Sequence, residues 1–236
     1  MRKSRILIVD DDIGVVKALR ANLQAKDCEV LTAMDGTEAL QVIDREVPDL
    51  IILDIMMPRM DGLEVCRQLR EWSAIPIIML SARHDVEEKA KCLNSGADDY
   101  MTKPFGINEL IARVRAVLRR TSDVGTVVNT PNFTSGDLQI NFAARQVVKA
   151  GSEVKLTPTE YTLLQELTLG AGKVFTHATL LGKVWGPEYA EEREYLRVFI
   201  GRLRKEIEED PANPKFIVTI PGVGYKFQSQ CEPAAA

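Results

Sequence analysis

The sequence has few cysteines, no long apolar run and no excess of basic charge. Its 236 residues include 4 cysteines, at positions 28, 66, 92 and 231, with neither C-x-x-C spacing nor an adjacent histidine. We therefore expect reduced thiols in a cytoplasmic protein, not a metal site. No apolar stretch reaches about 18 residues, which excludes a transmembrane helix. The four-residue apolar run after the basic N-terminus indicates a strand, not a signal peptide.

The overall balance of residues is that of a soluble globular protein. Hydrophobic residues make up 45% and charged residues 27% of the chain, which is long enough for one large domain or two ordinary ones. The formal net charge is -4, so no general basic character indicates a nucleic-acid partner. Any such partner must be indicated by a local pattern.

The first half of the chain alternates short apolar runs with amphipathic stretches. The apolar runs predict strands at Ile6–Val9, Glu29–Ala33, Leu50–Asp54, Ile75–Leu80 and Tyr100–Met101. The stretches between them predict helices at Val15–Ala25, Glu38–Arg45, Leu63–Glu71, Val86–Ser95 and Ile107–Arg120. Strict alternation requires βαβ crossovers. We therefore predict an α/β domain at 1–120 with a doubly wound, five-stranded parallel sheet of the flavodoxin type.

The composition changes near residue 121. Small, polar and turn-forming residues predict a linker at 121–132. Further strands are predicted at Leu138–Ile140, Gln146–Lys149, Glu153–Leu156, Phe216–Thr219 and Gly224–Phe227, and helices at Pro158–Leu169, His177–Val184 and Arg193–Glu208. Thr157, followed by Pro158 and Glu160, predicts a capping box. This order fits a winged helix-turn-helix α+β domain at 133–230, with a tail at 231–236.

Acidic residues end two of the predicted strands. Asp54 ends the third strand, and Asp10 and Asp11 follow the first. Parallel strands present their carboxyl ends at one rim, so these carboxylates should converge there. Clustered like charges require a cation or a shared proton, and hard oxygen ligands suit Mg²⁺. We expect Asp54 to be a nucleophile that accepts phosphate, with Asp10, Asp11 and the Met56 carbonyl around the ion.

Two more polar residues end strands at the same rim. Ser81 could donate its hydroxyl to a phosphoryl oxygen, and Lys103 could supply a positive charge beside it. The Lys103–Pro104 bond is a candidate cis peptide. Each residue has an ordinary alternative, since a strand-end aspartate is more often a helix cap and a lysine before proline is usually a surface residue. Their joint position at the ends of four strands favours the phosphate site.

These motifs resemble the receiver domain of bacterial response regulators, a CheY-like fold. The matching segments are Asp10-Asp11-Asp12, Leu53-Asp54-Ile55-Met56-Met57-Pro58, Asp61-Gly62, Ser81-Ala82-Arg83, Gly96-Ala97-Asp98-Asp99-Tyr100 and Lys103-Pro104-Phe105. The C-terminal stretch resembles the DNA-binding domain of the OmpR/PhoB family, so the resemblance covers nearly the whole chain. Within that family, residues 70–76 and 184–187 are similar to the KdpE-like regulators of potassium uptake.

The resemblance implies phosphotransfer from a sensor histidine kinase to Asp54, with Lys103 contacting the phosphoryl group. It also implies that Ser81 and Tyr100 form a switch pair. A phosphoryl group adds nearly two negative charges and three acceptor oxygens, so Ser81 should move toward it and Tyr100 should enter the vacated space. The alternatives are a helix N-cap for Ser81 and a half-buried strand aromatic for Tyr100.

The same movement should alter a surface on the fourth helix, fifth strand and fifth helix, through which this family pairs its receivers. Its expected members are Lys89, Ala90, Leu93, Asp98, Asp99, Glu109, Ala112, Arg113 and Arg120. Opposite charges on different elements suit a two-fold interface, so we expect a homodimer on phosphorylation. The alternative is an ordinary solvated face of i,i+4 pairs.

The third helix of the second domain is locally basic. Residues 193–205 carry five positive charges and one negative charge, a net +4. In a winged fold this predicts a recognition helix for the major groove of double-stranded promoter DNA, at tandem half-sites. The expected contact residues are Arg193, Tyr195, Arg197, Val198, Gly201, Arg202, Arg204, Lys205 and Lys226. Arg197 and Arg202 would read guanine or bind phosphate, and Val198 would contact a thymine methyl.

The wing departs from the family pattern, which often has arginine where Pro221 stands. A minor-groove arginine contact is therefore not expected, and Lys215 or Lys226 would bind phosphate instead. Two other functions compete with this reading. A Mg²⁺-dependent phosphohydrolase would carry Asp-x-Asp-x-Thr, which is absent after Asp54. A receiver with a protein-binding module would not bind DNA. We expect a transcription regulator and not an enzyme, with RNA polymerase as a further candidate partner and no membrane partner.

Overall fold

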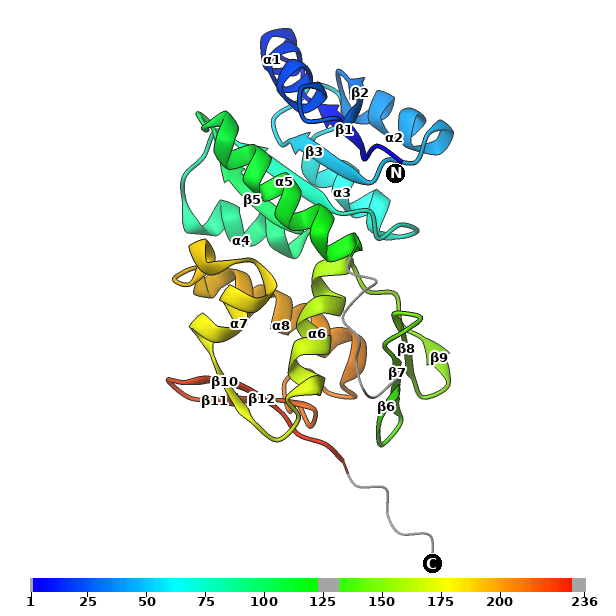
Figure 1. Ribbon diagram of the computed structural model, residues 1–236, viewed down its shortest axis with the longest axis vertical. Helices are drawn as coiled ribbons and strands as arrows, with labels where there is room; N and C mark the ends of the chain where they lie inside the picture. The colour runs from blue at the N-terminus through cyan, green and yellow to red at the C-terminus, as the bar shows by residue number, and fades with distance from the viewer. Residues whose placement is uncertain (1, 123–131, 231–236) are drawn as a thin grey trace, which may run out of the picture. The chain divides into compact units, whose positions relative to one another are not determined.

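The chain is described by a computed structural model over residues 2–122 and 132–230, which form two compact units, Met1–Arg119 and Arg120–Ala236 (Figure 1). Most of the predicted linker, at 123–131, and the predicted tail, with Cys231, lie outside the described residues. No helix in the described part of the chain is long and apolar enough to cross a bilayer.

The first unit is a five-stranded parallel sheet with helices between the strands. Its strands are β1 (Arg5–Val9), β2 (Glu29–Ala33), β3 (Leu50–Asp54), β4 (Ile77–Ser81) and β5 (Asp99–Thr102). Its helices are α1 (Ile13–Gln24), α2 (Gly36–Arg45), α3 (Gly62–Arg70), α4 (Val86–Asn94) and α5 (Ile107–Ser122). The strand order is β2-β1-β3-β4-β5 and every pair is parallel, which confirms the predicted doubly wound fold.

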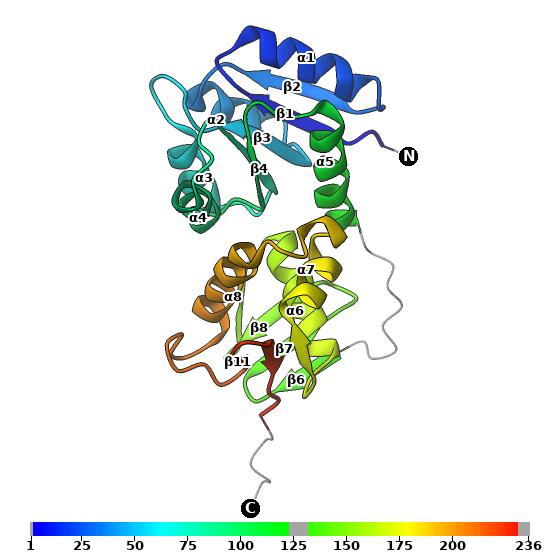
Figure 2. The same ribbon diagram turned by 90° about the vertical axis from the view of Figure 1, so that its left-hand side faces the viewer.

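Apolar side chains on both faces hold the sheet between two helical layers. Helices α1 and α5 cover one face, where Leu19 and Val114 pack with the strand residues Ile8, Ile52 and Leu80. Helices α2, α3 and α4 lie on the other side of the sheet (Figure 2). Because β3 and β4 are buried along their whole length, polar side chains are placed only where the strands end.

The second unit combines two antiparallel sheets with three α-helices. Its strands are β6 (Asn132–Ser135), β7 (Leu138–Asn141), β8 (Gln146–Lys149), β9 (Ser152–Glu153), β10 (Val174–Thr176), β11 (Ile217–Ile220) and β12 (Gly224–Phe227). Its helices are α6 (Pro158–Leu169), α7 (His177–Val184), α8 (Arg193–Ile207) and the short 3₁₀ helix η1 (Pro187–Tyr189). The sheets have the orders β6-β7-β8-β9 and β10-β12-β11.

Most elements of the second unit match the prediction, and the differences have local causes. The predicted strand Glu153–Leu156 is shorter, because the chain leaves the sheet to enter α6 at Thr157. Thr157 and Glu160 form the predicted capping box there. Strands β6 and β10 were not predicted, since both are short and lie at the edges of their sheets.

Helix α8 is fixed by an aromatic core and by a buried carboxylate. Trp185 lies edge-on to Tyr195 and Phe199 of the helix, with centroid distances of 6.1 and 5.0 Å. At the C-terminal end of the helix, Glu208 accepts hydrogen bonds from the backbone N–H groups of Phe216 and Ile217, at 2.9 and 2.8 Å. This carboxylate therefore joins the end of α8 to the start of the terminal hairpin.

Replacing Glu208 with alanine should destabilise the second unit. The buried N–H groups of Phe216 and Ile217 would lose their acceptor, so we expect a loss of about 3 kcal/mol in the free energy of unfolding. Urea unfolding measures the change. Glu209→Ala is the matched control, because the exposed Glu209–Lys215 pair should contribute less than about 1 kcal/mol. Equal losses of stability in Glu208→Ala and Glu209→Ala would contradict the stabilising role given to Glu208.

Candidate functional site

Three carboxylates meet at the carboxyl ends of β1 and β3. The ligand oxygens of Asp10, Asp11 and Asp54 all lie within 4.8 Å of one another. Asp10 and Asp54 are buried, whereas Asp11 is exposed at the mouth of the site. A buried pair with a third carboxylate open to solvent forms a cluster of hard oxygen ligands that is accessible from one side.

Lys103 lies between the two buried carboxylates. Its Nζ is 2.7 Å from Asp10 Oδ2 and 2.7 Å from Asp54 Oδ1. The other oxygen of Asp10, Oδ1, accepts the backbone N–H of Asp12 at 2.9 Å. The Lys103–Pro104 peptide is cis, as predicted. One ammonium thus faces three carboxylates, and the site retains a net negative charge.

Burial and charge act in opposite directions on this pair. Burial raises the pKa of Asp54, the bond to Lys103 lowers it, and Asp10 and Asp11 raise it again, so that the net shift is upward. For Lys103, burial lowers the pKa, but its hydrogen bonds to Asp10 and Asp54 outweigh burial and the pKa is raised. The lysine therefore keeps its charge, while Asp54 is ionised at a cost that a cation would reduce.

A glycine allows α3 to begin close behind Asp54. A Cβ added to Gly62 would lie 2.2 Å from the Asp54 carbonyl oxygen, too close for any side chain. The Gly62 N–H donates to the Ile55 carbonyl at 3.0 Å, which fixes the loop between β3 and α3. Met56 lies in this loop, two residues after Asp54, and its side chain is exposed.

Ser81 and Tyr100 meet through the loop after β4. Ser81 ends β4 with its side chain buried, and its Oγ accepts the backbone N–H of Arg83 at 3.1 Å. The Tyr100 hydroxyl donates to the carbonyl of the same Arg83. Tyr100 is only 3% exposed, so its ring occupies the inward position. Arg83 was not singled out from the sequence, because its contribution is a backbone carbonyl that no side-chain pattern reveals.

The predicted pairing surface is divided between exposed and buried residues. Glu109 and Ala112 are exposed, and Lys89, Ala90 and Arg113 are half-buried. The residues Leu93, Asp98, Asp99 and Arg120 are buried, contrary to their assignment to an open face. Arg113 bonds Asp99 at 3.1 Å and Glu109 at 2.9 Å within the chain. A second receiver would therefore contact the exposed residues of this surface first.

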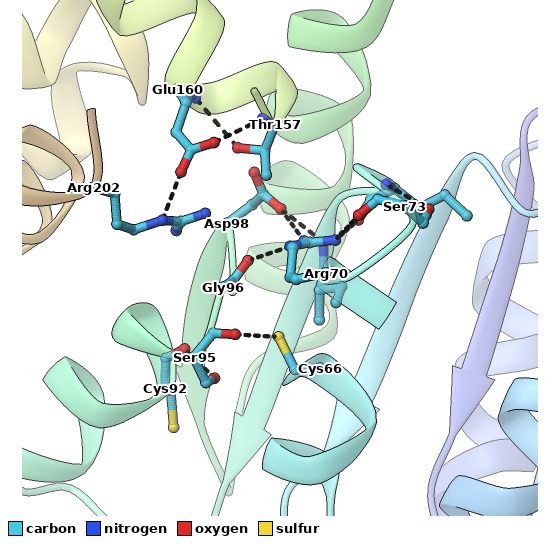
Figure 3. Close-up of polar contacts among 12 residues, drawn as sticks. Cys66, Arg70, Ser73, Cys92, Ser95, Gly96, Asp98, Thr157, Glu160 and Arg202 are labelled. Carbon is cyan, nitrogen blue, oxygen red and sulfur yellow. Dashed lines mark hydrogen bonds and ion pairs between the residues drawn. The ribbon is translucent and has the colours of Figure 1, made fainter. Parts of the chain in front are cut away.

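Asp98 is held by an arginine that sequence reasoning did not connect to it. Figure 3 shows Arg70 directed at Asp98, with Arg70 Nη2 3.0 Å from Asp98 Oδ2. The same oxygen accepts the backbone N–H of Ile77 at 3.0 Å, and Arg70 Nε donates to the Gly96 carbonyl at 2.9 Å. The network fixes the start of β4 and of β5. The assignment of Asp98 to the pairing surface is corrected accordingly.

The exposed side of α8 is narrower than predicted and carries fewer cations. Arg193, Arg197 and Lys205 are exposed and Gly201 is half-buried, at intervals of four residues along one face. The Arg197 side chain is 78% exposed and lies 3.5 Å from Glu194. A row of cations along one face of a helix is a suitable surface for a polyanion.

Four other residues predicted to contact DNA are engaged within the chain. Tyr195 and Val198 are buried, so neither can contact a base, and this corrects their assignment. Arg202 Nε lies 2.6 Å from the Glu160 carboxylate, as Figure 3 shows. Arg204 donates to the Ile217 carbonyl at 2.6 Å and to Thr219 Oγ1 at 2.8 Å. Both arginines therefore hold α8 against its neighbours.

The hairpin offers few free cations. Pro221 and Val223 are exposed at its turn, where no arginine stands. Of the two lysines predicted to bind phosphate, Lys215 pairs with Glu209 at 2.8 Å and Lys226 is half-buried in β12. The basic face of α8 is thus the main positive surface that the sequence and structure together identify in this unit.

Comparisons with known proteins match both units. Residues 6–115 match the response regulator receiver domain, and residues 151–227 match the C-terminal domain of transcriptional regulatory proteins. The chain is 42% identical to the transcriptional regulatory protein KdpE of Mycobacterium tuberculosis, over 95% of this chain and 99% of the relative. It is 44% identical to the probable transcriptional regulator ycf27 of Cyanophora paradoxa, over 97% and 98%.

A solved structure also matches over the full length. The response regulator DrrB of Thermotoga maritima, described as an OmpR/PhoB homologue, is 34% identical, with a TM-score of 0.52 over 97% of this chain and 100% of DrrB. The similarity to KdpE and to ycf27 is nearly equal. Sequence identity alone therefore does not select one regulated process.

The raised pKa of Asp54 predicts that this carboxylate destabilises the fold. A carboxyl whose pKa is higher in the folded state opposes folding above that pKa, and the penalty disappears as the pH falls below the unfolded value. In buffer with EDTA, Asp54→Asn should therefore raise the free energy of unfolding of the first unit at pH 7, and the gain should shrink on acidification.

Urea unfolding at a series of pH values measures this difference. Asp44→Asn is the matched control, because it removes an exposed carboxylate from α2 and should have little effect at any pH. The prediction would be contradicted if Asp54→Asn did not raise the free energy of unfolding at pH 7. It would also be contradicted if the increase became larger as the pH fell.

Proposed function

The chain belongs to the OmpR/PhoB family of two-component response regulators, and from that membership we propose that phosphorylation of Asp54 controls its binding to promoter DNA. The observation that carries the proposal is the arrangement of Asp10, Asp54 and Lys103, with one ammonium 2.7 Å from each of two buried carboxylates. This arrangement supports the proposal because it would give a nucleophile, a cation site and a positive charge at one rim.

In the proposed reaction, an Asp54 carboxylate oxygen attacks the phosphorus of a phosphohistidine on the sensor kinase. The new O–P bond forms as the P–N bond breaks, and the electron pair returns to the imidazole nitrogen. Lys103 remains beside the site and balances the charge on the transferred oxygens. The fully buried strand β3 holds the nucleophile in a fixed position at the mouth of the sheet.

The residues present suit a divalent cation. The side chains of Asp10, Asp11 and Asp54 supply hard oxygens within 4.8 Å of one another, and the Met56 carbonyl is the further ligand implied by the family. A bound Mg²⁺ would neutralise charge on the carboxylates and on the incoming phosphoryl oxygens. It would also favour the ionised form of Asp54, whose pKa is otherwise raised by burial.

The switch would run from Ser81 through the Arg83 carbonyl to Tyr100. A Ser81 hydroxyl drawn toward a phosphoryl oxygen would move the β4–α4 loop, because Ser81 accepts the Arg83 N–H and Tyr100 donates to the Arg83 carbonyl. That movement would favour a homodimer through the exposed part of α4 and α5, with Glu109 and Arg113 exchanging their internal pair for pairs across the two-fold axis.

The C-terminal domain would place α8 in the major groove, with Arg193, Arg197 and Lys205 contacting phosphates or guanine edges. A receiver dimer would bring two such domains to tandem half-sites, and RNA polymerase is the further partner proposed for the bound complex. The chain would accept one phosphoryl group and return it slowly to water, without the multiple turnovers of an enzyme.

Phosphoryl labelling tests the acceptor directly. Wild-type chain incubated with a small acyl phosphate and Mg²⁺ should gain one phosphoryl group by intact-mass measurement, and EDTA should prevent the gain. Asp54→Asn should abolish labelling, because the amide lacks the nucleophilic oxygen, and Asp44→Asn should leave it unchanged. Labelling that persists in Asp54→Asn would assign the acceptor to another residue.

Two arginines of α8 should behave differently when each is replaced by alanine. Arg197→Ala removes an exposed cation and should weaken DNA binding about tenfold, and reduce the slope of log affinity against log salt by about 1 if it contacts phosphate. Arg202→Ala leaves the buried Glu160 carboxylate unpaired and should cost about 3 kcal/mol of stability.

Fluorescence anisotropy with a labelled duplex and thermal unfolding measure the two effects. Arg45→Ala is the control, since it removes an exposed arginine from α2 of the receiver and should change neither property. Full DNA affinity in Arg197→Ala would place the DNA-binding surface elsewhere.

A further inference from the structure

The basic face of α8 has a glycine at its centre. Arg193, Arg197, Gly201 and Lys205 follow one another at four-residue intervals, so they lie in one row along the helix. Arg197 and Lys205 flank Gly201 and are both exposed. The positive row is therefore interrupted at the one position where the helix backbone is not covered by a side chain.

Within residues 2–122 and 132–230, no neighbouring atom requires glycine at position 201. A Cβ added to Gly201 would meet no atom within 4 Å, and the residue lies in ordinary helical conformation. By contrast, a Cβ on Gly224 would lie 2.0 Å from the Phe175 carbonyl oxygen. Glycine in a helix interior is less favourable than alanine because it loses more backbone freedom on folding. Alanine at position 201 would therefore make the folded domain more stable than glycine does.

The neighbours of Gly201 do not fill the space above it. Arg202 is directed at Glu160, and Arg204 is directed at Ile217 and Thr219. Ile200 is buried. The residues that border the glycine are thus held on the inner sides of α8, and the outer surface at its centre is bare backbone between two cations.

We propose that Gly201 is the point of closest approach between α8 and DNA, where the missing side chain lets the helix backbone come against the base edges. This inference rests on the proposed function of α8 in DNA binding. Arg197 and Lys205, about 12 Å apart along the helix axis, reach past the glycine on either side. A Cβ at position 201 would hold the helix away from the floor of the groove. The helix backbone would then lose its close contacts with the base edges.

The test uses the full chain, phosphorylated with an acyl phosphate and Mg²⁺, and the duplex that the wild type selects from a random-sequence pool. Gly201→Ala should raise the midpoint of thermal unfolding of its domain by about 4 °C, and yet weaken binding to the selected duplex about tenfold. Gly201→Leu should weaken it further. Binding to the unselected pool, and the salt dependence, should change little, because the cations remain.

Gly182→Ala is the matched control. Gly182 lies in α7, and a Cβ there also meets no atom within 4 Å, so the substitution should give a similar gain in thermal stability with unchanged DNA affinity. Equal affinity of Gly201→Ala and wild type for the selected duplex would overturn the inference. So would an equal loss in Gly182→Ala, which would assign the effect to helix stiffness.

The same measurements separate failure of the inference from failure of the proposed function. If the wild type selects no duplex from the pool, or if Arg197→Ala binds as tightly as the wild type, DNA binding by α8 is wrong. If Arg197→Ala weakens binding and Gly201→Ala does not, the function stands and the close approach at Gly201 is wrong.

Discussion

The contact of Lys103 with Asp10 and Asp54 is the interaction on which the phosphorylation site depends. Two buried carboxylates at the end of a parallel sheet repel each other. A single ammonium 2.7 Å from both allows them to be charged together. Because Asp11 adds a third carboxylate, the formal charge of the cluster is negative, which suits the divalent cation and the phosphoryl transfer proposed for this site.

The same rim is connected to the rest of the first unit by backbone groups. The Lys103 N–H donates to the Ser81 carbonyl, and Ser81 and Tyr100 both bond the backbone of Arg83. In the proposed switch, a change of charge at Asp54 would act on the ends of β4 and β5 through these short hydrogen bonds, with no long chain of side chains. The Arg70–Asp98 pair holds the opposite ends of these strands, so the proposed movement would be confined to the loops at the rim.

Sequence patterns predicted the sheet and the clustering of charged residues at its rim because both follow from local order. Apolar runs located β1, β3 and β4, and the rule that parallel strands end at one rim brought Asp10, Asp54 and Lys103 together. The same reasoning was less accurate on α8. Helical periodicity placed Val198 and Arg202 on an outer face, but Val198 is buried and Glu160, far away in sequence, binds Arg202. Helical periodicity does not predict how much of the helix surface is buried. Nor does it predict which carboxylate, distant in sequence, pairs with a cation on the helix.

Internal pairing of α8 bears on how phosphorylation could control DNA binding. Arg202 is fixed to α6 through Glu160, and Arg204 and Glu208 fix the helix to β11. Contacts within the domain therefore hold α8, and the basic face that it carries, in place. A surface that is already assembled needs no rearrangement to bind a half-site. In the proposed mechanism, the gain on phosphorylation then arises from pairing: a receiver dimer raises the effective concentration of the second DNA-binding domain beside the first. On this proposal, phosphorylation would control how many domains bind together, and the row from Arg193 to Lys205 would set the affinity of each domain.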